Sequence, residues 1–259
     1  MYRAHPKDGI AWITGASSGI GRAVALELSR RGYTVAATAR RQAELDALAA
    51  ESPNIFPFPG DVTDRPAVAG LAAAIEAEHG PIALAFLNAG VYFADEFNQF
   101  SADTVWQTFE INVGGTVNCL DPVLVAMRRY GRGQIAINAS IAGFGGIEGS
   151  AGYGSSKAAL IYMAEALKLT YEKAGITLQI VSPGFVHSDM TAQNKFKMPL
   201  IMDAGRAAKI ICDGFAKGGF EITFPRRLAY FFKAVCLLPY PLYFQQMRRF
   251  AKRKPLPDG

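Results

Sequence analysis

Tyr153 and Lys157 have the clearest potential for chemistry in this chain, because they lie four positions apart in a segment with helical spacing. At that spacing both side chains emerge on one face of a helix. A free tyrosine has a pKa of about 10, and a nearby ammonium group favours the phenolate and lowers that pKa. We therefore expect Tyr153 to act as a general acid or base near neutral pH. Taken alone, the same spacing is also typical of an exposed surface pair.

Two other polar residues could assist this pair. Ser140 follows a short apolar run at 134–138, where its hydroxyl could hydrogen-bond a substrate oxygen as charge develops on that oxygen. Asn112 lies within a long segment of helical spacing. Each residue also has an ordinary structural interpretation, Ser140 as a turn residue and Asn112 as a partner of backbone groups.

A turn with the spacing G-x-x-x-G-x-G follows the first apolar run, at Gly15, Gly19 and Gly21, directly before a helical segment. Glycine permits tight turns and close approach of a ligand to the backbone. The free N–H groups and the dipole at a helix start favour the charge of a pyrophosphate. The turn therefore predicts a dinucleotide site, and close packing of a helix on a strand is the alternative explanation.

Short apolar runs alternate with longer segments of helical spacing along the chain. The runs lack polar alternation, which is typical of parallel strands buried on both faces. The predicted strands are 10–14, 34–39, 54–58, 82–87, 134–138, 177–181 and 220–224, and the predicted helices are 19–30, 42–50, 66–79, 103–129, 152–173 and 203–216. A TIM barrel has the same alternation, so the choice between a barrel and an open sheet depends on the motifs.

The order of the motifs resembles that of the short-chain dehydrogenase/reductases over about residues 8 to 224. The matching elements are the glycine turn, Asn88-Ala89-Gly90, Asn112, Ser140, Tyr153-x-x-x-Lys157 and Pro183-Gly184. The resemblance implies a single-domain Rossmann-type α/β fold, a doubly wound parallel sheet of about seven strands with helices on both faces. It also implies hydride transfer between a nicotinamide and a carbonyl or secondary alcohol.

The resemblance assigns roles within the catalytic set of Asn112, Ser140, Tyr153 and Lys157. Tyr153 exchanges a proton with the substrate oxygen, and Lys157 also holds the nicotinamide ribose hydroxyls. Asn112 anchors a water that connects Lys157 to solvent. A non-catalytic dinucleotide sensor or membrane-recruited scaffold on the same fold is the alternative, and the intact set favours an enzyme.

The end of the second predicted strand favours NADP(H) as the cofactor. An NAD enzyme of this fold places an acidic residue there, whereas this chain has Arg40 and Arg41, which could also simply open a solvated helix. A guanidinium matches the oxygens of a 2′-phosphate, and Arg22 is a further candidate. The predicted cofactor-binding residues are Gly15, Ser17, Ser18, Gly19, Ile20, Gly21, Arg40, Arg41, Asp61, Val62, Asn88, Ala89, Gly90, Tyr153, Lys157, Pro183, Gly184, Val186 and Ser188.

Two of these cofactor assignments come from the resemblance, and for each the sequence also offers an alternative. Asp61 and Val62 would flank the adenine, although Asp61 alone would be an ordinary turn or helix-cap residue. Ser188 stands where the family commonly has a threonine that contacts the nicotinamide carboxamide, and Thr191 is a neighbouring candidate.

The segment after Ser188 is expected to cover the substrate as a lid at 189–203. Its large apolar residues are Phe196, Met198, Leu200, Ile201 and Met202. Their character indicates a hydrophobic substrate, such as a lipid-, steroid- or oxoacyl-like carbonyl compound or alcohol.

Charge divides the chain at residue 225. The net charge is +5, but residues 225–259 carry eight basic residues and one acidic residue, or +7, which leaves −2 for residues 1–224. We therefore divide the chain into a catalytic domain at 1–224 and a basic, aromatic extension at 225–259. Within 226–238 one helix face collects Leu228, Phe231, Phe232, Val235 and Leu238, which makes the extension amphipathic.

Three environments fit this extension. It could insert at the headgroup level of an anionic membrane, pack on the protein's own core or a partner subunit, or end in solvent. Its apolar run at 234–244 is shorter than the roughly 20 residues that span a bilayer. The clustered charge and the aromatic residues within apolar runs argue against nucleic acid as a partner.

The remaining features favour a cytoplasmic enzyme, with peripheral contact on the inner face of a membrane as an option. Cys119, Cys212 and Cys236 have neither disulfide-framework nor zinc-site spacing, so we expect no metal. The first ten residues lack the apolar stretch of a secretory signal. By resemblance, the protein is a homodimer or homotetramer assembled through the segments 103–129 and 152–173.

Overall fold

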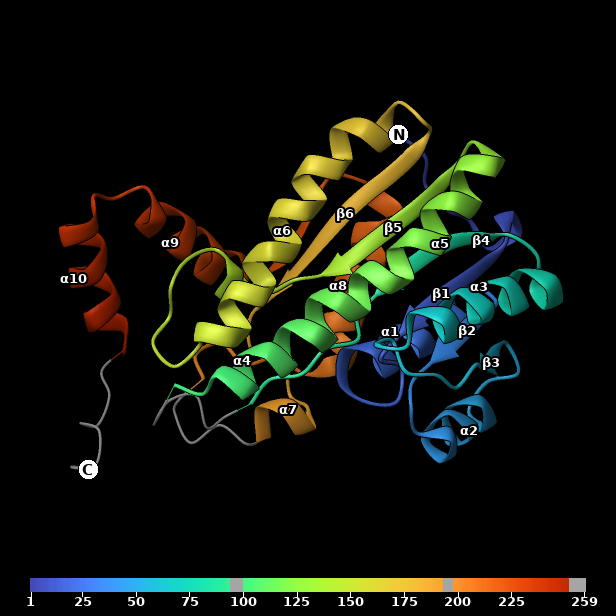
Figure 1. Ribbon diagram of the computed structural model, residues 1–259, viewed down its shortest axis with the longest axis horizontal. Coiled ribbons are helices and arrows are strands. Elements are labelled where there is room, and N and C mark those ends of the chain that lie inside the picture. The colour runs from blue at the N-terminus through green and yellow to red at the C-terminus, as the bar shows by residue number, and fades with distance from the viewer. Residues whose placement is uncertain (94–99, 193–197, 252–259) are drawn as a thin grey trace.

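The computed structural model describes residues 1–93, 100–192 and 198–251. Within them, one parallel sheet has seven strands in the order β3-β2-β1-β4-β5-β6-β7 (Figure 1). The strands are β1 (Ile10–Thr14), β2 (Val35–Thr38), β3 (Ile55–Pro57), β4 (Ile82–Leu87), β5 (Gly133–Asn138), β6 (Ile176–Pro183) and β7 (Glu221–Phe224). The predicted open, doubly wound sheet is confirmed, with strand ends shifted by one or two residues.

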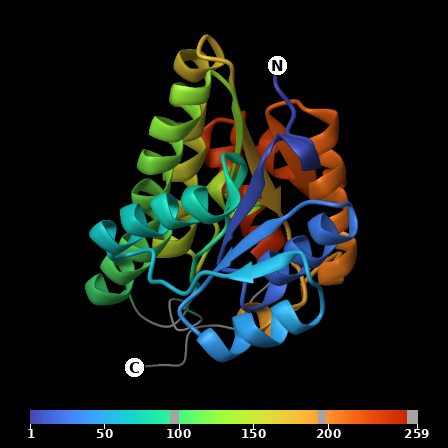
Figure 2. The ribbon, with the colours of Figure 1, turned by 90° about the vertical axis from the view of Figure 1, so that its right-hand side faces the viewer.

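Helices cover both faces of the sheet (Figure 2). One face packs against α1 (Gly19–Arg30), α2 (Gln42–Ala50) and α8 (Ala204–Lys217). The other face packs against α3 (Arg65–His79), α5 (Gly115–Tyr130) and α6 (Ala151–Glu172). The strands are buried on both faces because each face has its own layer, which explains their continuous apolar sequences.

The segment predicted as one helix at 103–129 is divided in the structure. It forms α4 (Ala102–Phe109), a π-helical turn (Glu110–Gly114) and α5. The bare α-carbon of Gly115 explains the close packing here, because an added Cβ would lie 2.5 Å from Cγ2 of Val62. The π turn contains Asn112, which is fully buried. The expectation of a regular helix was therefore wrong at Asn112, and π turns are frequent at functional sites.

The C-terminal extension forms two helices, α9 (Arg226–Cys236) and α10 (Tyr240–Ala251), which we call the hairpin (Figure 1). Its buried side chains share a cluster with Ile141 of the segment after β5. The predicted apolar face holds for Leu228, Phe232 and Val235, whereas Phe231 and Leu238 are exposed. The inner face of the hairpin therefore packs on the protein's own core, one of the three environments considered for the extension.

Specific contacts fix the hairpin to the segment that follows Ser140. The Tyr243 hydroxyl donates to the Gly146 carbonyl at 2.8 Å, and Cys236 Sγ donates to the Phe144 carbonyl at 3.1 Å. Gly145 lies between them, and a Cβ added there would lie 2.6 Å from Cys236 Sγ. Among the described residues, no helix has both the length and the apolar character needed to cross a membrane.

Candidate active site

A cavity of about 1090 Å³ opens at the carboxyl ends of the strands. In open α/β sheets this edge is where ligands bind. Nearly all predicted site residues line it, namely Gly15, Ser17, Ser18, Gly19, Ile20, Arg40, Arg41, Asp61, Val62, Asn88, Ala89, Gly90, Ser140, Tyr153, Lys157, Pro183, Gly184, Val186 and Ser188. Gly21 and Asn112 do not line the cavity. Gly21 packs against Gly15, and Asn112 is hydrogen-bonded to Val91, and both of these neighbours line the cavity.

The glycine turn joins β1 to α1 and opens the helix start to the cavity. Gly15 and Gly19 have φ values of +67° and +55°, in the left-handed region that favours glycine. A Cβ added to Gly21 would lie 2.2 Å from the carbonyl oxygen of Gly15, so this glycine permits close packing of helix on turn. Ser18, at the N-cap, makes no side-chain cap, which leaves the first N–H groups available to an anion.

One end of the cavity is basic. Arg41 Nη2 donates to Ser17 Oγ at 3.0 Å, which joins the end of β2 to the glycine turn. Arg40 Nη1 lies 4.0 Å from Asp61 Oδ2. Hydrogen bonds from the backbone N–H and the hydroxyl of Thr63, with the Arg40 charge, hold the Asp61 pKa below its usual value despite partial burial. The guanidinium groups of Arg40 and Arg41 and the hydroxyl of Ser17 thus line the same end of the cavity.

At this basic end of the cavity, the structure changes two interpretations that the sequence allowed. Arg22, a further candidate for the phosphate, pairs instead with Glu51 and does not line the cavity. The N-cap of α3 is Asp64, which accepts from Ala67 N at 3.1 Å. Asp61 therefore does not cap that helix, and its carboxylate faces the basic end of the cavity.

Asn88 ties three strands together at the middle of the cavity. Its side-chain amide donates to the carbonyls of Thr14 and Gly15, and its Oδ1 accepts from Asn138 Nδ2 at 2.9 Å. These bonds join the ends of β1, β4 and β5. The glycine turn and the catalytic residues are therefore held in fixed relative positions.

Tyr153 and Lys157, on the first turns of α6, lie beside Ser140 at the end of β5. Lys157 is almost completely buried, and Nζ donates to the Asn138 carbonyl at 2.8 Å. Desolvation lowers the Lys157 pKa from 10.5 to about 8. The Lys157 Nζ lies 5.6 Å from the centroid of the Tyr153 ring.

The expected lowering of the Tyr153 pKa is wrong for this structure. Desolvation by burial raises the pKa, and the hydrogen bond with Ser140 offsets only part of this effect. Lys157 Nζ donates to the Asn138 carbonyl. Tyr153 is therefore neutral at physiological pH, the form that can donate a proton.

Asn112 organises the groups around Gly90. Its side chain accepts from Val91 N at 2.7 Å and donates to Val91 O at 3.1 Å and to Ser156 Oγ at 3.0 Å. A Cβ added to Gly90 would lie 3.0 Å from Asn112 Oδ1 and 3.5 Å from Lys157 Nζ. The π turn, the loop after β4 and α6 therefore meet at this glycine.

Ser188 and Thr191, the two candidates for contact with the nicotinamide carboxamide, lie together in the structure. Thr191 Oγ1 donates to Val186 O at 2.7 Å and accepts from Ser188 N at 3.0 Å. Both residues line the cavity, at the start of α7 (Asp189–Ala192). The two hydroxyl groups are thus close enough for either to serve the same ligand.

The predicted lid at 189–203 is only partly described, because residues 193–197, including Phe196, lie outside the described residues. Met190 and Pro199 line the cavity. Met198, Leu200, Ile201 and Met202 do not line it. Met202 pairs with Val186 in a short parallel bridge and packs on the core, which anchors this segment at one end.

Sequence reasoning missed the far end of the cavity. Its lining includes Tyr92, Phe93, Ile147, Phe232, Arg249 and Phe250. The ring of Tyr92 lies edge-on to that of Tyr153, with 5.3 Å between centroids. The amphipathic pattern of the extension indicated that one face is buried, but such a pattern does not specify the surface that receives it.

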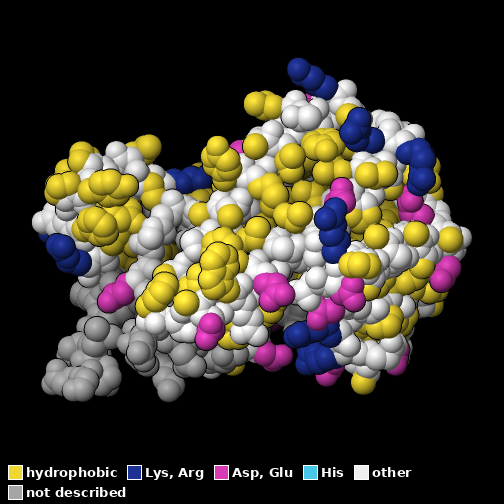
Figure 3. All heavy atoms as spheres, viewed as in Figure 1, with side chains coloured by type: hydrophobic (Ala, Val, Ile, Leu, Met, Phe, Trp, Pro, Cys, Tyr) yellow, Lys and Arg dark blue, Asp and Glu magenta, His cyan; other side chains and the backbone are white. Residues whose placement is uncertain are grey.

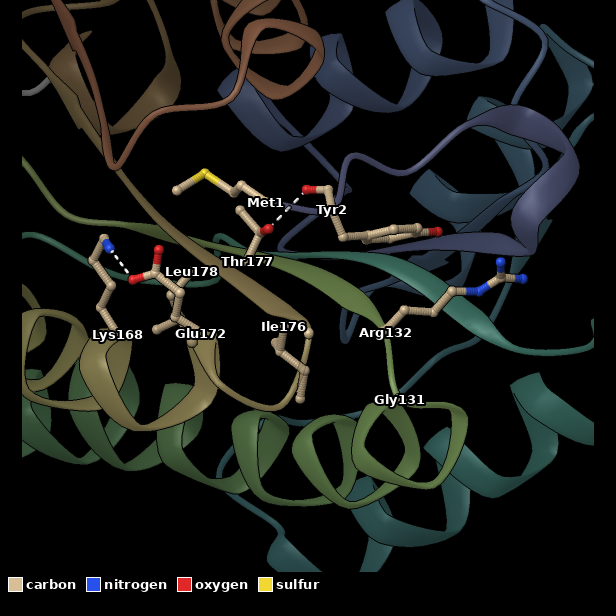
Figure 4. Close-up of a pocket in the computed structure, with 10 residues that line it drawn as sticks. Met1, Tyr2, Gly131, Arg132, Lys168, Glu172, Ile176, Thr177 and Leu178 are labelled. Carbon is tan, nitrogen blue, oxygen red and sulfur yellow. Dashed lines mark hydrogen bonds and ion pairs between the residues drawn. The ribbon is translucent and has the colours of Figure 1, made fainter.

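A second, smaller cavity of about 220 Å³ lies at the opposite edge of the sheet, at the starts of β5 and β6 (Figure 4). Lys168 pairs with Glu172, the Thr177 hydroxyl donates to the Tyr2 carbonyl, and the Arg132 guanidinium lies over the Tyr2 ring, 5.9 Å from its centroid. Among the described residues, no cluster of His, Cys, Asp and Glu could hold a metal ion.

Comparison with known proteins identifies the family. Residues 9–198 match the family model for short chain dehydrogenases. An uncharacterised oxidoreductase of Myxococcus xanthus is 36% identical over 243 residues, covering 92% of this chain and 96% of its own. The chain therefore belongs to the short-chain dehydrogenase family and is an oxidoreductase.

Two further relatives agree with this assignment. The 3-oxoacyl-[acyl-carrier-protein] reductase FabG of Escherichia coli is 34% identical over 187 residues, covering 70% of this chain and 75% of its own. A crystal structure of a short-chain dehydrogenase from Streptomyces avermitilis superposes with a TM-score of 0.79 at 26% identity, covering 94% of this chain and 97% of that chain.

Members of this family bind NAD(P)(H), and the cavity is suited to such a dinucleotide. The uncapped start of α1 suits a pyrophosphate. Gly90 leaves open space beside Lys157 Nζ that a Cβ would fill. The volume of about 1090 Å³ exceeds the roughly 300–1,000 Å³ typical of one small-molecule site, which leaves room for a substrate as well.

Proposed function

We propose that the protein is an NADP(H)-dependent carbonyl reductase or alcohol dehydrogenase for a hydrophobic substrate, with Tyr153 as its acid and base. The observation that carries the proposal is the position of Tyr153, which is hydrogen-bonded to Ser140 and lines the same cavity as Lys157, Arg40 and Arg41. When bound, the nicotinamide would supply or accept a hydride at the substrate carbon.

In the reductive direction, Ser140 holds the carbonyl oxygen and Tyr153 donates its proton to that oxygen. Loss of the proton leaves a phenolate, and the nearby Lys157 ammonium stabilises it. Because its pKa is about 8, Lys157 is mostly charged at neutral pH. Asn112, through its bonds to Val91 and Ser156, keeps the loop after β4 and α6 in place around this lysine.

Arg40 and Arg41 support NADP(H) over NAD(H) as the cofactor. Both line the basic end of the cavity at the end of β2, and Arg41 donates to Ser17, so three donor groups lie around the position of a 2′-phosphate. The end of β2 offers no acidic side chain that would accept from a 2′-hydroxyl, since Ala39 precedes the two arginines.

The aromatic lining beyond Tyr153 supports a hydrophobic substrate. Tyr92, Phe93 and Phe232 contribute to it. The name of the Escherichia coli relative indicates a 3-oxoacyl-[acyl-carrier-protein] as its substrate, and such an acyl chain is apolar. Medium-chain 3-oxoacyl thioesters, steroid ketones and simple aryl ketones therefore form the first substrate panel.

Tyr153→Phe tests the proposal. We expect NADPH oxidation with the accepted ketone to fall by about 10²–10⁴-fold, because a general acid contributes about that much. Binding of NADPH, measured by fluorescence, should change little. Equal turnover of the two proteins would overturn the role of Tyr153, and NADPH binding without turnover of any ketone in the panel would support the sensor or scaffold alternative.

We further propose a homo-oligomer assembled through α4, α5 and α6. Their outward face exposes large apolar side chains (Figure 3). They are Trp106, Val117, Val125, Tyr162 and Leu169. Contiguous apolar surface of this kind is typical of a protein interface, and helices that lie side by side offer a flat surface for a homodimer, with a homotetramer as the larger alternative.

The tip of the hairpin supports peripheral membrane contact by an otherwise cytoplasmic enzyme. Leu237 and Tyr240 are 87% and 76% exposed. Arg227 and Arg248, also exposed, lie towards the other ends of the two helices. A convex apolar tip with basic residues behind it suits an anionic lipid surface, in which aromatic residues enter the headgroup level and arginines face phosphate.

A further inference from the structure

The hairpin forms one wall of the substrate end of the cavity. Phe232 of α9 and Phe250 of α10 both line it, and their ring centroids lie 5.0 Å apart. Both belong to the cluster around Ile141, the residue that follows Ser140. The wall is therefore continuous with the catalytic end of the cavity.

Arg249 places a positive charge on this wall. It lines the cavity next to Phe250 and is exposed. Among the described residues, it makes neither a hydrogen bond nor an ion pair. A guanidinium on a cavity wall that has no partner within the described part of the chain is available to a ligand.

The position of Arg249 is set by the fold. The inner face of α10 is buried at Tyr243 and Met247, and the Tyr243 hydroxyl bonds Gly146. Arg249 follows this anchored turn directly. Because the backbone is already ordered, a ligand that contacts the guanidinium orders only that side chain.

Two acidic residues are among the described residues that line the cavity, Asp61 at the dinucleotide end and Asp189. Asp189 is the acidic residue of α7 that lines the cavity. Figure 1 shows α7 and α10 well apart, and among the described residues no ion pair joins Asp189 to Arg249. Arg40 and Arg41 belong to the opposite, dinucleotide end.

We propose that the substrate end selects molecules with an acidic head group joined to an apolar chain. Arg249 binds the head group, a carboxylate or a phosphate monoester, with the forked donors of its guanidinium. The chain lies against Phe232 and Phe250 and leads towards Ser140 and Tyr153. The inference deepens the proposed reductase function and rests on it for the position of the carbonyl.

Direct binding tests the inference without turnover. Dodecanoate, dodecyl phosphate and the neutral methyl dodecanoate are titrated calorimetrically into NADPH-saturated protein below their micelle concentrations. We expect the unaltered protein to bind at least one of the two anions about tenfold more tightly than the ester, since hydrogen bonds to charged groups typically give that much. The two anionic arms distinguish a carboxylate from a phosphate.

The matched variants are Arg249→Ala and Arg248→Ala, which remove the same charge from neighbouring exposed positions of α10, although only Arg249 lines the cavity. Arg249→Ala should abolish the preference for the anion, Arg248→Ala should retain it, and Arg249→Lys should retain part of it. Unchanged binding by Arg249→Ala, equal losses in both alanine variants, equal binding of anions and ester, or no binding overturns the inference. Loss of ketone reduction in Tyr153→Phe, with anion binding intact, separates it from the catalytic proposal.

Discussion

Replacement of Lys157 by methionine should stabilise the apoprotein at neutral pH while removing activity. Burial lowers the pKa of this lysine from 10.5 to about 8, so its charge is held in the folded state against a desolvation penalty. That lowering corresponds to about 3 kcal/mol at a pH where both states are protonated. Methionine also leaves the Asn138 carbonyl without its donor, which costs roughly 1–3 kcal/mol. We expect a net gain of about 1 kcal/mol at pH 7.

The pH dependence gives the more decisive measurement. Because the folded-state pKa lies below the unfolded-state value, the unfolded chain binds more protons between about pH 8 and 10.5, and the free energy of unfolding of the unaltered protein rises through this window. Lys157→Met lacks this rise. The advantage of the variant should therefore shrink by about 2 kcal/mol between about pH 7 and pH 9.5.

Urea unfolding, followed by tryptophan fluorescence at several pH values in the absence of NADPH, measures both the gain in stability at pH 7 and its decrease at higher pH. Lys209→Met is the control, because Lys209 is exposed in the middle of α8. Other titrating groups are common to all three proteins and cancel in the differences. If the difference in the free energy of unfolding between Lys157→Met and the unaltered protein stays constant across this pH range, the claim that Lys157 is charged at a desolvation penalty is refuted.

Three further outcomes are expected. Arg40→Asp should change the ratio of kcat/KM for NADPH over NADH by at least about tenfold towards NADH, because a charge-assisted contact to the 2′-phosphate becomes a repulsion; an unchanged ratio would contradict the NADP(H) proposal. Tyr162→Glu should shift the protein to the monomer in light scattering at micromolar concentration, because it places a charge within an apolar interface, and an unchanged molar mass would exclude α6 from that interface. Leu237→Glu should reduce co-sedimentation with vesicles of phosphatidylcholine and phosphatidylglycerol more than Leu169→Glu does, and equal effects would remove the membrane proposal.

The parts of the fold that could be predicted from the sequence depend on local rules. A buried parallel strand such as Ile82–Leu87 needs a continuous apolar run, and the turn at Gly15 and Gly19 needs positive φ values. Both requirements are visible in residue types. The convergence of Ser17 and Arg41 at the end of β2 follows from the topology of the fold once the order of the strands is known.

The remaining features depend on packing between distant segments. The π turn at Glu110–Gly114 accompanies the close approach of Gly115 and Val62, which are far apart in the chain. The direction of the Tyr153 pKa depends on how deeply its ring is buried. The position of Arg249 depends on the surface on which the hairpin packs, which no periodicity records.

The hairpin has a consequence for how this enzyme can change during evolution. The residues proposed for the dinucleotide and for catalysis all precede β7, whereas the wall that bears Phe232 and Arg249 belongs to one continuous segment after Phe224. A single recombination event near the end of β7 could therefore replace that wall and leave every strand of the sheet in register. Chimeras joined at this point would exchange substrate preference as an inherited unit, separately from the chemistry that acts on the substrate.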